Sequence, residues 1–196
     1  MKPEARVTMQ ALGDYFHEHQ LVVDQSLAEL CQPLMAVGDV LVEALGAGHK
    51  VLTFGNGGSA TQASHFAGEL VGRFLKNRGP LPAVTLSSDP GVVTCIGNDF
   101  GYGALFERQV EALAQPGDVA FGFTTSGKSE NVQRGLAMAR QKAAVTVALT
   151  GSAGLSRGKA DYLLDIPSAS TSSIQEVHLM FLHVWCIYVD QAFGHR

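Results

Sequence analysis

The segment KVLTFGNGGSATQASHFAGELVGRF, residues 50–74, contains the strand, loop and helix that decide the fold. Residues 50–54 form a short apolar run, as in a strand buried on both faces of a sheet. The glycine-rich run GNGGS at 55–59 follows, and apolar residues then recur at helical spacing as far as Phe74. A strand that turns through glycines into a helix predicts one unit of a parallel α/β sheet.

The same alternation of strand, loop and helix continues along the chain. Further strands are predicted at 82–86, 118–123, 144–149 and 162–166, and further helices at about 130–142 and 173–193. Strands that alternate with helices predict a parallel sheet covered by helices on both faces. Because ligands of such sheets bind outside the carboxyl ends of the strands, the loops at 55–59 and 124–129 are the expected site.

The chain before residue 50 is predicted to be helical. Apolar residues follow a helical period from Val7 to Leu45, and Pro33 predicts a break between two helices. We expect one domain over residues 1–196, with N-terminal helices at about 5–46 and an α/β core at about 50–196. The fold class is therefore an α/β three-layer sandwich with a central parallel sheet and extra N-terminal helices.

Charge, cysteine content and hydropathy bear on nucleic-acid binding, on the cellular compartment and on membrane insertion. The formal net charge is -4 without a basic run, which argues against nucleic-acid binding. Three cysteines without CxxC or metal-ligand spacing predict reduced thiols in a cytoplasmic protein. The longest apolar stretch, residues 177–189, is interrupted by histidines and is too short to cross a membrane, and residues 1–20 do not resemble a secretory signal.

The first loop, residues 55–59, has the composition of an anion-binding turn. Glycines let the backbone approach a ligand, and the amides at the start of the next helix favour a negative charge. The alternative is a plain turn in which Ser59 caps the helix and Gln62 completes a capping box. A dinucleotide fingerprint is disfavoured because Ala60 replaces its last glycine, and the sequence has no P-loop motif.

The second loop, TTSGKS at 124–129, carries four hydroxyl groups and a glycine directly after a strand. Hydroxyls and amides so placed can donate to several phosphate oxygens at once. The alternative is a polar turn with Ser129 as the cap of the next helix. Two such loops at the same edge of one sheet favour phosphate binding.

Acid–base residues lie on two of the predicted helices. His65 and Glu69 are four residues apart on one face, which suits a metal pair, a base with its partner, or a solvated pair. The last helix is apolar on nearly every side, which indicates burial in a core or a subunit interface. Gln175 and His183 on that helix lie roughly 80° apart and could face one centre. Taken alone, His183 and His178 are both interpreted as core histidines with hydrogen-bond partners.

Five segments resemble the signature runs of bacterial phosphoheptose isomerases, a family of sugar-isomerase (SIS) domains. They cover nearly the whole chain in the family's order: residues 55–74, 86–119, 124–132, 148–151 and 173–183. The resemblance implies a flavodoxin-like sheet and an enzyme that interconverts sedoheptulose 7-phosphate and D-glycero-D-manno-heptose 7-phosphate through an enediol, for the supply of heptose to surface glycans such as lipopolysaccharide. It also implies a homotetramer with sites shared between subunits, and zinc at each site in members that bind it.

The resemblance further implies roles for individual residues. Glu69 matches the catalytic carboxylate, expected to move the proton between two carbons, and His183 matches the acid–base that serves the oxygens. The positions that hold zinc are His65, Glu69, Gln175 and His183. Positions expected to contact the sugar or its phosphate are Asn56, Gly57, Gly58, Ser59, Arg73, Asn98, Asp99, Thr124, Thr125, Ser126, Ser129 and Gln175.

The chain departs from the family's common pattern at some positions of the expected site. Lys128 stands where an asparagine is common, and it either touches the phosphate or points to water. Gln62 stands where an aspartate is common. These changes leave open an isomerase or binder of another sugar phosphate. A further alternative is a non-catalytic SIS tetramer that binds the replication initiator protein, a group that generally lacks the carboxylate that this chain has at Glu69.

Overall fold

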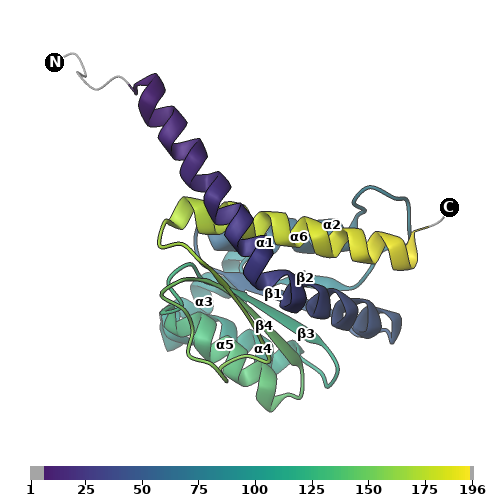
Figure 1. Ribbon diagram of the computed structural model, residues 1–196. Coiled ribbons are helices and arrows are strands. Elements are labelled where there is room, and N and C mark those ends of the chain that lie inside the picture. The colour runs from purple at the N-terminus through teal and green to yellow at the C-terminus, as the bar shows by residue number, and fades with distance from the viewer. Residues whose placement is uncertain (1–6, 195–196) are drawn as a thin grey trace.

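The computed structural model describes residues 7–194, and a five-stranded parallel sheet lies at its centre (Figure 1). The strands are β1 Val51–Gly55, β2 Ala83–Thr85, β3 Val119–Phe123, β4 Val145–Gly151 and β5 Tyr162–Ile166. Their order is β2-β1-β3-β4-β5, and every neighbouring pair runs parallel. The five predicted strands are therefore confirmed, and their ends agree to within two residues.

Helices cover both faces of the sheet and complete the predicted three layers (Figure 1). On one face lie α1 Met9–Gly46, α2 Gly58–Val71 and α6 Thr171–Phe193; on the other lie α3 Pro90–Phe100, α4 Leu105–Leu113 and α5 Glu130–Gln141, with the short 3-10 helix η1 Tyr102–Ala104. Alternate residues of the strands enter the two cores, so Phe121 packs on Phe66 and Trp185 while Ala120 faces the other side. None of the helices in this described part of the chain has the length and apolar character that a bilayer crossing requires.

The N-terminal helix is one element, so the predicted break into two helices is wrong. α1 continues through Pro33, and it bends without interruption (Figure 1). Proline removes one backbone hydrogen bond, but the turns that follow it are held by the burial of Leu34, Val37 and Leu41. The Trp185 indole of α6 also donates to the Leu34 carbonyl at 2.9 Å. Packing thus outweighs the local break signal. Residues 5 and 6 of the predicted helical range lie outside the described residues.

The order of the strands places a topological switch between β1 and β3. The helix after β1, α2, packs on one face of the sheet, whereas the helix after β3, α5, packs on the other. In open α/β sheets, ligands bind at the carboxyl ends of the strands where the following helices diverge in this way. The two loops singled out in the sequence follow these two strands.

Candidate active site

The first loop leads into α2 without a side-chain cap. Gly57 occupies the N-cap position with φ 55°, a left-handed conformation that favours glycine. Ser59 lies buried inside the helix, and the Gln62 side chain donates to the backbone carbonyl of Gln175, so the alternative of a Ser59–Gln62 capping box is wrong. The hydrogen bonds of the helix begin at the amides of Ser59 and Ala60. The amides that precede them remain for an anion.

Hydroxyl groups of the second loop, residues 124–129, form hydrogen bonds within the loop. Ser129 occupies the N-cap position of α5, but its hydroxyl lies 3.1 Å from that of Thr124 and does not cap the helix. The Lys128 amide donates to the Ser126 hydroxyl at 3.2 Å, and both of these residues are exposed. The Thr125 carbonyl accepts a backbone amide from the end of β4 at 3.1 Å. The loop therefore presents hydroxyls beside a helix start whose N-cap residue, Ser129, makes no side-chain capping bond. In the first turn of the helix, the Val132 amide donates to Asn131 Oδ1 at 2.9 Å.

A pair of side-chain amides joins the first loop to the start of α5. Asn56 of the first loop and Asn131 in the first turn of α5 each donate to the other's side-chain oxygen at 2.9 Å. The Tyr102 hydroxyl also donates to the Asn56 oxygen at 2.7 Å. Sequence reasoning identified Asn56 but missed Asn131 and Tyr102, because these partners lie 75 and 46 positions away. The pair sets the distance between the starts of α2 and α5.

The predicted acid–base residues of α2 and α6 come together in space. His65 Nε2 lies 3.1 Å from Glu69 Oε1 and 3.4 Å from His183 Nε2. The Phe74 ring stacks on the His183 ring with centroids 5.3 Å apart. His183 is half-buried and faces α2, so it is not an ordinary core histidine. The cluster combines one carboxylate with two imidazoles that remain partly open to solvent, which is a set of groups suited to proton transfer.

His178, in contrast, is the core histidine that the sequence predicts. It is fully buried, and its Nε2 lies 3.2 Å from the Thr150 carbonyl. Burial lowers the pKa of His178 to about 4, because the charged imidazolium is disfavoured away from water. The ring is therefore neutral at pH 7 and takes no part in the cluster.

The remaining predicted residues of α2, α3 and α6 make other contacts. The Gln175 side chain lies against Gly58, where a Cβ atom would come within 2.5 Å of its Nε2. Arg73 is exposed and donates to a neighbouring backbone carbonyl at 3.3 Å. Asn98 donates to Asp99 at 2.7 Å on the exposed side of α3. The single chain thus brings Gln175 to the first loop, while Asn98 and Asp99 contact each other at the surface.

The donors predicted for a metal are only partly assembled. Within residues 7–194, no group of three or more His, Cys, Asp and Glu has the arrangement of a metal site. His65 contacts both Glu69 and His183, but the Gln175 side chain lies at the start of α2 instead. The chain therefore presents two converging imidazoles and one carboxylate, which are ligand types that zinc accepts.

Comparisons with known proteins cover most of the chain. The sequence profile of the SIS domain family matches residues 14–151. A phosphoheptose isomerase of Aquifex aeolicus is 51% identical over 164 residues, which are 82% of this chain and 84% of that protein. One of Trichlorobacter lovleyi is 45% identical over 181 residues, which are 92% of each chain. Solved phosphoheptose isomerases from Neisseria gonorrhoeae and Francisella tularensis match with TM-scores of 0.86 and 0.89 at 34% and 31% identity, over 94% and 95% of this chain and 100% of theirs.

Proposed function

Since this chain belongs to the SIS domain family and, within it, to the phosphoheptose isomerases, we propose that its two loops bind the sugar phosphate and that Glu69 and His183 transfer the protons. The protein is a sugar-phosphate isomerase that interconverts sedoheptulose 7-phosphate and D-glycero-D-manno-heptose 7-phosphate in heptose biosynthesis. The observation that carries the assignment of roles is the contact of His65 with both Glu69 and His183, at 3.1 and 3.4 Å. His65 and Glu69 lie on α2, the helix that starts at the first loop, and His183 lies on α6.

The phosphate is proposed to bind between the two loops at the topological switch. The starts of α2 and α5 both point their first amides toward this edge, and the positive end of each helix favours a negative charge. Hydroxyls of Ser126 and Ser129 add further donors. The amide pair of Asn56 and Asn131 supports this proposal because it holds the two helix starts together.

Glu69 is proposed as the base that moves the carbon-bound proton, and His183 as the group that serves the oxygens. Isomerisation between an aldose and a ketose moves one proton between C1 and C2 and requires proton transfer at both oxygens. The Glu69 side chain is 24% exposed, so it is open to a substrate while His65 holds its Oε1. Phe74 fixes the plane of the His183 ring by stacking.

Zinc is proposed to bind at the same cluster. Ligand atoms around a tetrahedral zinc lie about 3.4 Å apart, given bonds of roughly 2.1 Å. The two facing Nε2 atoms of His65 and His183, at 3.4 Å, have this separation. Gln175 would have to turn away from Gly58 to act as a further ligand. When bound, zinc would polarise the sugar carbonyl.

A homotetramer in the cytoplasm is proposed, in which other copies of this chain cover the exposed side of α1. Phe16, Leu21 and Leu27 expose 64%, 56% and 62% of their surface. The first turns of α1 extend beyond the sheet and the helices that cover it (Figure 1). Apolar side chains gathered on one exposed helix indicate an interaction surface. The cytoplasmic location rests on the free cysteines, which suit a reducing compartment.

Turnover of sedoheptulose 7-phosphate by the purified protein, followed by NMR with and without a chelator, tests the reaction and the metal separately. Turnover that chelation abolishes and zinc restores would support both. Turnover that is indifferent to chelation would retain the isomerase and refute zinc. A folded protein without turnover would refute the reaction and favour either a binder of the replication initiator protein or a site for another sugar phosphate.

Glu69→Gln tests the assignment of the base. The change removes the charge and keeps the shape, so we expect kcat to fall at least about 10²-fold with the fold intact, as for loss of a general base. Glu107→Gln is the matched control, because the Glu107 side chain is 28% exposed and pairs with Arg134 on the other face of the sheet. Unchanged turnover in Glu69→Gln would remove Glu69 from the mechanism.

A further inference from the structure

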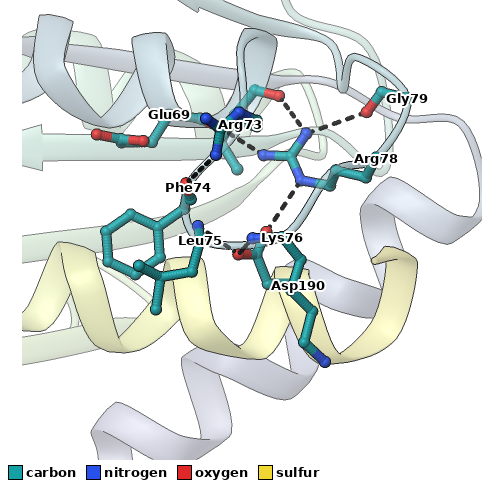
Figure 2. Close-up of polar contacts among 9 residues, drawn as sticks. Glu69, Arg73, Phe74, Leu75, Lys76, Arg78, Gly79 and Asp190 are labelled. Atoms are coloured by element: carbon teal, nitrogen blue, oxygen red, sulfur yellow. Dashed lines mark hydrogen bonds and ion pairs between the residues drawn. The ribbon is translucent and has the colours of Figure 1, made fainter. Parts of the chain in front are cut away.

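Two buried charged residues hold the linker between α2 and β2, residues 72–82 (Figure 2). Arg78 comes from this linker and Asp190 from α6, and Arg78 Nε lies 3.3 Å from Asp190 Oδ1. Their side chains are 1% and 4% exposed. The proposed function gives neither residue a role. Because buried charges persist only when they are paired and hydrogen-bonded, their partners show what they hold in place.

Arg78 satisfies the carbonyl end of α2. Its guanidinium donates to the backbone carbonyls of Glu69 at 2.5 Å and Gly79 at 3.0 Å (Figure 2). It also donates to the Leu70 carbonyl at 2.8 Å. Because α2 ends at Val71, the Glu69 and Leu70 carbonyls belong to its last turn, where helix carbonyls lack partners within the helix. Helix ends fray when such groups are left to water. Glu69 itself lies in this last turn, so the contact bears directly on its position.

Asp190 holds the other side of the same linker. Its Oδ2 accepts the backbone amides of Leu75 at 2.7 Å and Lys76 at 2.8 Å. These bonds fix the chain directly after Phe74, whose ring stacks on His183 with an angle of 13° between the planes. Asp190 lies seven residues after His183 on α6, about two helical turns away. The linker is therefore tied to the helix that carries His183.

We propose that Arg78 and Asp190 are positioning residues for the isomerisation. Arg78 holds Glu69 through the carbonyls of α2. Asp190 holds Phe74 against His183 through the linker amides and also pairs with Arg78. The inference rests on the proposed roles of Glu69 and His183. An arginine is needed because its planar group directs donors at three carbonyls and a carboxylate at once, whereas a lysine carries its donors on one atom.

Asp190→Asn and Arg78→Lys test this proposal. Asp190→Asn replaces one acceptor oxygen of the carboxylate by a donor. Arg78→Lys keeps the buried positive charge, so this variant remains informative if Asp190→Asn does not fold. Asp118→Asn is the matched control. Asp118 is also buried, accepts the amides of Lys50 and Gln115 at 2.9 and 2.7 Å, and pairs with the Lys50 ammonium. It directly precedes β3 and so lies at the amino ends of the strands, whereas the two loops lie at their carboxyl ends.

The first readout is the split between kcat and KM for sedoheptulose 7-phosphate, corrected for the folded fraction. We expect kcat to fall at least about tenfold in both test variants, because misplacing a catalytic group by about 1 Å can cost roughly 10²-fold. We expect KM to stay within about threefold, since the phosphate loops are untouched. A kcat in both test variants equal to that of Asp118→Asn would overturn the proposal.

The second readout does not require turnover. The ring protons of His183, assigned in NMR spectra with a His183→Gln variant, are shielded by the stacked Phe74 ring. They should move downfield in Asp190→Asn and Arg78→Lys and stay in place in Asp118→Asn. If the wild-type protein does not turn over the sugar, the proposed function fails, and this measurement still decides whether Arg78 and Asp190 hold Phe74 against His183. Unmoved His183 signals in both test variants would refute it.

Discussion

Lowering the pH from 7 to 5 should destabilise this protein through one buried histidine. His178 of α6 is fully buried, and its Nδ1 has no hydrogen-bond partner among the described residues. Burial lowers its pKa from 6.5 to about 4. The unfolded chain therefore binds a proton below about pH 6.5 that the folded protein accepts only near pH 4. This contribution to stability is fully present above pH 6.5 and is lost as the pH falls toward 4.

The magnitude follows from these two pKa values. Their separation corresponds to about 3 kcal/mol of unfolding free energy in full, of which about 2 kcal/mol is lost between pH 7 and pH 5. Urea unfolding at a fixed protein concentration measures this loss, and the fluorescence of the single, buried tryptophan, Trp185, reports it.

Two variants separate His178 from the other titrating groups. His178→Gln removes the buried ring, so its unfolding free energy should fall about 2 kcal/mol less than that of the wild type over the same interval. His17→Gln also removes one imidazole, from a position that is exposed in the single chain, and serves as the control for the loss of a histidine. Equal pH dependence in the wild type and His178→Gln would refute burial of His178 as the cause.

Three further outcomes can be checked. Ser126→Ala combined with Ser129→Ala should mainly raise KM, because phosphate contacts serve substrate and transition state alike, and a loss confined to kcat in steady-state assays would contradict the phosphate cradle. Burial, with the nearby carboxylates, raises the pKa of Cys186 to about 12, so a thiol reagent at pH 8 should label exposed Cys95 and leave Cys186 unmodified in mass spectra. Phe16→Glu, on the exposed side of α1, should lower the assembled mass in light scattering, and an unchanged mass would remove Phe16 from the subunit interface.

The sheet and its two loops were predictable because their signals are local. Each strand is a short apolar run, and the loops at 55–59 and 124–129 follow two of these runs directly. The spacing of His65 and Glu69 likewise predicts a shared helix face, which the 3.1 Å contact confirms. These signals span a few residues and do not depend on the rest of the chain.

The features that sequence reasoning missed depend mostly on distant partners. Pro33 is a valid local break signal, but packing against α6 decides the outcome. Arg78 and Asp190 are 112 positions apart, so no periodic pattern links them. The sequence prediction assigned no helix to residues 90–100, although Asp89 followed by Pro90 is a helix start signal, and in the structure Asp89 caps α3. That helix could have been found; the buried ion pair could not.

The amide pair of Asn56 and Asn131 has a consequence for the conditions under which the site keeps its shape. Neither amide carries a charge or a titrating proton, so the bridge between the starts of α2 and α5 is the same in acid and in base and is insensitive to ionic strength. If an ion pair stood in its place, the incoming phosphate would compete for the cation, and the contact between the two helix starts would break when the phosphate bound that cation. With a neutral bridge, the two helix starts keep their spacing whether the anion is present or absent.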